Sequence, residues 1–72
     1  MLSFSPLLKV LKEKNVSKTQ LKTDKILAGM TYTNVMAATK TPVNEGISIS
    51  AVNRLCGYLQ CQPGDIMEYI PD

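Results

Sequence analysis

The most informative segment of the sequence is VSKTQLKTDKILAGMTYTNVMAATK, residues 16–40. Ser17 predicts the start of a helix, because it is a good N-cap and Gln20 stands three positions later, the arrangement of a capping box. Val16 and Leu21 have the spacing of the hydrophobic staple that accompanies such a start. The stretch therefore opens with a helix at Ser17.

A turn around Gly29 leads to a second helix. Gly29 can take the left-handed conformation that closes the first helix, or it can lie in an irregular turn. Thr31 or Thr33 can cap the second helix. Two short helices around a glycine-bearing turn form the helix-turn-helix pattern, whose second helix can enter the major groove of DNA. The second helix has these residues at helical spacing: Tyr32, Val35, Met36 and Thr39.

One predicted helix precedes this pair. Ser5 caps it, Pro6 takes its first helical position, and Asn15 is a plausible left-handed terminator. Its apolar stripe consists of Leu7, Leu8, Val10 and Leu11.

Two predicted helices follow the pair, after a loop over residues 41–46. Ser48 caps the first of them, and Gln62 with Pro63 starts the second. No convincing strand is present, so five helices in a single domain of residues 1–72 predict a compact all-α fold. In the helix capped by Ser48, the side chains expected to face the core are Val52, Leu55, Cys56 and Leu59. In the helix that starts at Gln62 and Pro63, they are Ile66, Tyr69 and Ile70.

Length and composition exclude several classes of protein. The 72 residues suffice for one small domain, and an apolar content of 44% is ordinary for a globular chain. Residues 1–10 are too short and too broken, by Pro6 and Lys9, for a signal peptide or a membrane span. The expected location is the cytoplasm of a bacterial host cell.

Nothing in the sequence predicts an enzyme, a metal site or a cofactor. The chain has no histidine, no readable nucleophile–base pair and no glycine-rich phosphate loop. Cys56 and Cys61 lack the further ligands of a zinc site, so buried, reduced thiols are expected. Asp65 and Glu68 resemble a carboxylate pair, but a place in the first turn of a helix explains them without catalysis.

Charge is distributed unevenly along the chain. Residues 1–40 carry seven lysines against Glu13 and Asp24, a balance of +5. Residues 41–72 carry Arg54 against four carboxylates, a balance of −3. A basic half that contains the helix pair suits an anionic partner such as DNA, although a lysine-rich face can also be merely solvated.

Two segments carry a family resemblance. The run LLKVLKEKNVSKTQL, residues 7–21, and the run AVNRLCGYLQCQPGDIMEYIPD, residues 51–72, resemble the ends of Cro/CI-type (XRE) helix-turn-helix regulators, in a compact subgroup. The resemblance implies a Cro/CI-like (lambda-repressor-like) DNA-binding domain, with its helix-turn-helix at about residues 17–40. It rests at the C-terminus on Leu55, Cys56, Leu59, Cys61, Gly64, Asp65, Ile66, Glu68, Tyr69 and Pro71.

The middle of the chain departs from that family. The interval from Leu21 to Gly29 and the loop before the fourth helix are both longer than usual, and the second helix of the pair contains no arginine. Asn34 could pair with adenine, while threonines could donate to bases or touch methyl groups. The predicted base contacts are Thr31, Tyr32, Thr33, Asn34 and Ala37. The predicted phosphate contacts are Ser17, Lys18, Thr19, Gln20, Lys22 and Lys40.

Two functions are consistent with these features. The first is a transcriptional regulator of a phage or mobile-element genetic switch that binds double-stranded operator DNA, with a homodimer possible. The alternative is an antirepressor (modulator of repression) that binds the helix-turn-helix domain of a larger phage-type repressor. Small temperate-phage proteins of both kinds resemble this chain. The apolar second helix suits a protein partner, whose predicted surface is Tyr32, Met36 and Ala37.

Overall fold

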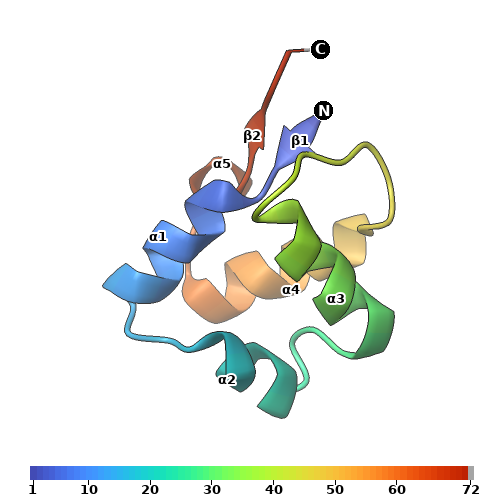
Figure 1. Cartoon of the computed structure of the whole chain (residues 1–72). Helices are drawn as coiled ribbons and strands as arrows, with labels where there is room; N and C mark the ends of the chain where they lie inside the picture. Colours follow the sequence, from blue (N-terminus) through green and yellow to red (C-terminus); the bar gives the residue numbers. More distant parts are fainter. Residues whose placement is uncertain (72) are drawn as a thin grey trace.

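The computed structural model describes residues 1–71, which form five helices and one short antiparallel strand pair (Figure 1). The predicted all-α class is confirmed. Asp72, counted above in the charge balance, lies outside the described residues. In chain order the elements are β1 (Leu2–Ser3), α1 (Ser5–Glu13), α2 (Lys18–Thr23), α3 (Gly29–Ala38), α4 (Ile49–Leu59), α5 (Pro63–Ile66) and β2 (Glu68–Tyr69).

The strand pair joins the two ends of the chain and was not expected from the sequence. Leu2 lies opposite Tyr69, and the backbones of Met1 and Ile70 exchange hydrogen bonds of 2.8 and 2.7 Å. Because α5 ends at Ile66, the chain beyond it is extended and the helical spacing no longer applies. Tyr69 is therefore 67% exposed, and the prediction that it faces the core is wrong.

The first helix of the pair, α2, starts as predicted and ends earlier. The capping box is present, with the Gln20 N–H donating to Ser17 Oγ at 3.1 Å and the Ser17 N–H donating to Gln20 Oε1 at 2.8 Å. Lys25 closes the helix in a left-handed conformation, with φ at 59°, and the Ile26 N–H donates to the Leu21 carbonyl at 2.9 Å. Gly29 does not close α2, because a lysine has already done so.

Gly29 instead opens the second helix. Its φ of 56° turns the chain from an extended residue, Ala28, into α3. The helix start has no side-chain cap, so the prediction that Thr31 or Thr33 caps it is wrong. Both threonines lie inside α3, and the Thr33 hydroxyl donates weakly to the Gly29 carbonyl at 3.5 Å. α3 therefore starts earlier than predicted, because Gly29 can adopt a positive φ and begin the helix without a capping side chain.

Ser48 caps its helix as predicted, whereas the start of α1 is displaced by one residue from the prediction. In α4, the Ser48 hydroxyl accepts from the Ala51 N–H at 3.1 Å. Ser5 is the first residue of α1 and not its cap, because the cap position is held by Phe4, which makes no side-chain cap bond. The Ser3 hydroxyl accepts from the Ser5 N–H at 3.1 Å instead.

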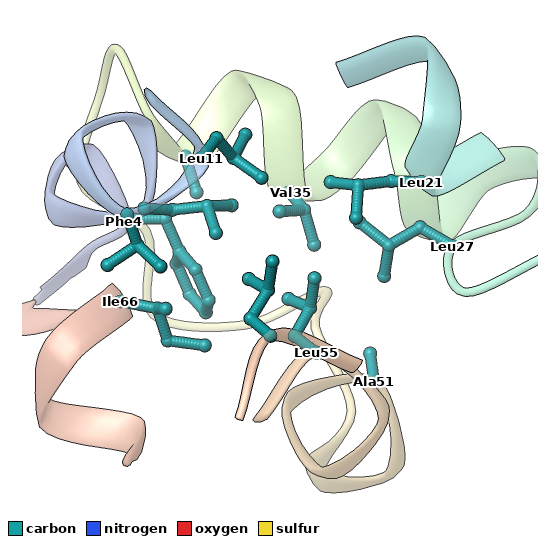
Figure 2. Packing of buried hydrophobic residues seen from close by; sticks show 12 residues of the cluster. Phe4, Leu11, Leu21, Leu27, Val35, Ala51, Leu55 and Ile66 are labelled. Atoms are coloured by element: carbon teal, nitrogen blue, oxygen red, sulfur yellow. The ribbon is translucent and has the colours of Figure 1, made fainter. Parts of the chain in front are cut away.

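A single core connects all five helices (Figure 2). Leu21 of α2 and Leu27 of the following turn lie beside each other and point towards Val35 of α3, above the α4 side chains. Leu8, predicted in the apolar stripe of α1, is 38% exposed. The buried apolar residues are Phe4, Leu7, Val10, Leu11, Leu21, Leu27, Val35, Ala38, Ala51, Leu55, Leu59 and Ile66.

Candidate nucleic-acid interface

One face of α3 is open to solvent. Val35 and Ala38 are fully buried and hold the opposite face against the core. Met30, Thr33 and Ala37 are exposed and recur at helical spacing, and we call these three residues the outer stripe. Met30, which the sequence did not single out, is 71% exposed. It was missed because a helix that starts at Thr31 or Thr33 would not contain it.

The other predicted base-contact residues flank the outer stripe and are half-buried: Thr31, Tyr32 and Asn34. The Asn34 amide donates to the Gly46 carbonyl at 2.8 Å and so ties α3 to the loop before α4. A pairing with adenine would have to use the remaining N–H and the carbonyl oxygen, in the orientation set by Gly46. Gly46 has a φ of 90°, a conformation that strains residues with a side chain, so a substitution there would strain the loop that holds this amide.

Tyr32 connects α3 to α2. It packs against the core, and the Lys22 ammonium lies 5.5 Å from the centre of its ring. This distance is within the range of a cation–π contact. Tyr32 and Met36, two of the three residues predicted to face a protein partner, are both half-buried against the core. Ala37 is the exposed one of that set.

The predicted phosphate contacts lie on α2 and at the end of α3. Ser17 and Gln20 are exposed, but their capping box already uses the Ser17 N–H and one oxygen of each side chain. Thr19 is exposed beside them. Within residues 1–71, no carboxylate forms an ion pair with the exposed lysines around this surface, which leaves their charge available to an anion. These lysines are Lys18, Lys22, Lys25 and Lys40.

Two side chains of α4 hold the turn between α2 and α3, and neither was predicted from the sequence. Arg54 donates through Nε to the Ile26 carbonyl at 3.0 Å and through Nη1 to Ser50 Oγ at 2.8 Å. Tyr58, four residues further on, donates its hydroxyl to Asp24 Oδ2 at 2.7 Å. Arginine and tyrosine at this spacing share one face of a helix, but the spacing does not reveal the partners that they contact. The turn is thereby fastened to α4 at Asp24 and at Ile26.

The Tyr58 contact predicts a specific pH dependence. Its hydrogen bond to Asp24, together with burial and the carboxylate charge, raises the pKa of Tyr58 above its ordinary value. A raised pKa in the folded state means that the contact stabilises the protein below about pH 10, the ordinary tyrosine value, and that this stability is lost as the pH rises further. Tyr58→Phe is expected to lower the melting temperature at neutral pH.

Thermal unfolding of both proteins from about pH 7 to pH 11 checks this, because the difference between them should shrink at the alkaline end. Tyr69→Phe is the control, since it removes a hydroxyl from an exposed ring on β2. A difference between wild type and Tyr58→Phe that stays constant with pH would contradict the expectation.

The two cysteines are free thiols at the junction of α4 and α5. Both are half-buried, and the Cys61 N–H donates to the Cys56 carbonyl at 3.1 Å. Burial, followed by the neighbouring Cys56, raises the pKa of the Cys61 thiol. In the part of the chain that the structure describes, no group of three or more potential ligands could hold a metal ion.

The arrangement of α2, the turn and α3 is that of a helix-turn-helix domain, with the outer face of its second helix open to solvent. A profile of the Cro/C1-type HTH DNA-binding domain family matches residues 6–72, so the chain belongs to this family. It is a DNA-binding protein of the class that regulates transcription, its partner is double-stranded DNA, and the family is not an enzymatic one.

This family membership confirms the resemblance seen in the sequence. No curated protein and no solved structure is significantly similar to the chain. None of the helices in residues 1–71 is long and apolar enough to span a membrane.

Proposed function

We propose that this protein controls a genetic switch of a phage or mobile element by binding operator DNA, with α3 in the major groove and α2 against the phosphate backbone. The observation that carries the proposal is the exposed outer stripe of α3, together with exposed lysines on α2 and after the end of α3 that have no carboxylate partner within residues 1–71. Lysines would position the backbone, and the exposed helix face would meet the base edges.

Under this proposal the lysines and the residues of α3 have different roles. Lys18 and Lys22 lie on α2, where the first helix of such a motif crosses the DNA backbone, and Lys40 follows the end of α3. Thr33 and Ala37 occupy the exposed face of α3. Thr31, Tyr32 and Asn34 lie at its flanks, where they would support the reading helix or reach the groove edge.

Titration of the purified protein into labelled duplex tests the proposal. One duplex comes from the region around its own gene and the other has the same composition in scrambled order, each at about 50 and 200 mM salt. We expect tighter binding to the first duplex, and a preference that persists at the higher salt concentration. Equal and weak binding to both duplexes would contradict the operator-binding role.

The alternative function is antirepression, in which the same face of α3 covers the helix-turn-helix domain of a partner repressor. Exposed apolar groups at Met30 and Ala37 favour it, since such groups suit a protein surface. The duplex titration separates the two functions, because an antirepressor has no need to prefer its own operator. Weak, unselective DNA binding would therefore direct the next experiment to the neighbouring repressor.

A further inference from the structure

We infer that the outer stripe of α3 selects DNA by contacts to the C5-methyl groups of thymine, with Met30 as the principal reading side chain. This inference rests on the proposed binding of α3 in the major groove and adds to it the chemistry by which the sequence is recognised. Met30 is the exposed residue of α3 that the predicted contacts did not include.

The position of Met30 suits a reading residue. It is the second residue of α3, and the N-terminal residues of a recognition helix are those that contact base edges. Its side chain is 71% exposed, so the core does not explain why an apolar residue stands there. A flexible thioether side chain can follow the surface of a groove and make apolar contacts with it.

The rest of the outer stripe offers methyl groups as well. Thr33 is exposed and carries a methyl group, while its hydroxyl donates only weakly, at 3.5 Å, to the Gly29 carbonyl. Ala37 has only a methyl group and is exposed. The stripe thus presents apolar carbon along successive turns of the helix. In the major groove, the matching apolar group is the thymine methyl.

Polar readout has little support on this helix. α3 has the sequence GMTYTNVMAA, which contains no charged residue and therefore no arginine for a guanine. Asn34 is the one amide in it, and Gly46 already engages this amide at 2.8 Å. Arg54, the single arginine of the sequence, donates to the Ile26 carbonyl and to Ser50 Oγ. Apolar contact is accordingly the base-reading chemistry that the exposed residues of α3 favour.

The surrounding charge identifies the occupant of the stripe as DNA. Lys18, Lys22 and Lys25 lie on α2 and in the turn, and Lys40 lies beyond the other end of α3. All four are exposed, and within the described residues none is paired with a carboxylate. An apolar stripe between cationic groups complements a methyl-lined groove between two phosphate backbones.

Removing thymine methyl groups one at a time tests the inference. The preferred site is first selected from a library of random duplexes, and each thymine in it is then replaced by deoxyuridine, which lacks only the methyl group. We expect a loss of about fourfold in affinity at each contacted position, the effect of burying one methyl-sized group. Met30→Ala is expected to abolish the difference between thymine and uracil at one position, whereas Met30→Leu should retain it.

Tyr69→Ala is the matched control, because it also truncates an exposed apolar side chain but lies on β2, at the opposite end of the molecule from α2 in Figure 1. It should leave the thymine preference unchanged. A selected site that tolerates uracil at every position would overturn the methyl readout and leave operator binding intact. Failure to bind any duplex would overturn both. Loss of a repressor complex in Met30→Ala, without any change in DNA binding, would assign the stripe to a protein partner.

Discussion

Replacing Leu27 with alanine is expected to lower the free energy of unfolding by about 2–5 kcal/mol. Leu27 lies in the turn between α2 and α3, is fully buried, and points with Leu21 towards Val35 (Figure 2). Truncation removes apolar contacts and leaves a cavity that the backbone of the turn cannot easily close, since the Leu27 N–H is held by the Leu21 carbonyl at 3.0 Å.

Such a loss is large for a chain of this size. Domains of 72 residues have free energies of unfolding of roughly 4–11 kcal/mol, so the variant would keep only part of that free energy. Urea unfolding followed by circular dichroism measures the change, and a fall in melting temperature of at least about 10 °C should accompany it. DNA binding should weaken as well, because α3 then loses the contact that fixes it against α2.

Met30→Ala is the matched control for this stability measurement. It shortens an aliphatic side chain only three residues away, but Met30 is 71% exposed, and substitutions at such positions usually change stability by less than about 0.5 kcal/mol. An equal effect of the two substitutions would mean that Leu27 does not belong to the core. The comparison thus distinguishes a residue that stabilises the fold, Leu27, from an exposed residue proposed to bind DNA, Met30.

The helix starts that sequence could predict are those with a local chemical signature. Ser17 with Gln20, and Ser48, make the backbone bonds that their side chains and spacing imply. The start of α3 has no such signature, because Gly29 enters it with a positive φ and no side chain caps it. A rule based on capping threonines therefore placed that start too late and left Met30 out of the candidate site.

Contacts between distant parts of the chain were beyond the reach of sequence. Tyr58 and Asp24 are 34 positions apart, and Arg54 reaches a backbone carbonyl 28 positions away, so neither contact has a periodic signal. The strand pair has only two residues in each strand, too few for an alternating pattern. The contacts of Arg54 and Tyr58 fix the turn between α2 and α3, whose conformation the local sequence does not determine.

Replacing both Lys18 and Lys22 with glutamine is expected to weaken DNA binding about 60-fold at 0.1 M salt. The binding constant of a protein for duplex DNA varies with salt to a power of about −0.9 for each phosphate neutralised, so one contact is worth about eightfold at that concentration. Both lysines are exposed on α2, and glutamine has a similar helix propensity, so the fold and the Ser17 cap should persist.

The salt dependence distinguishes lost phosphate contacts from damage to the protein. A slope of log affinity against log salt that becomes shallower by about 1.8 is expected, and the loss should be the same for the preferred and the scrambled duplex. Because phosphates carry no sequence information, a lysine that contacts them contributes to every duplex alike. A loss restricted to the preferred duplex would instead place these lysines at the base edges.

Lys9→Gln with Lys12→Gln removes the same charge from α1 and tests whether position matters as well as charge. Lys9 is paired with Glu13 at 4.0 Å, and its side chain is 82% exposed. If the net charge of +2 alone attracted DNA, the α1 and α2 variants would lose the same affinity and the same slope. If α2 lies against the backbone, the α1 variant should retain nearly the whole salt slope, because beyond about 10 Å at 0.1 M salt a charge is largely screened. Equal losses would therefore contradict the docking of α2 on the phosphates, while leaving a general attraction between the protein and DNA.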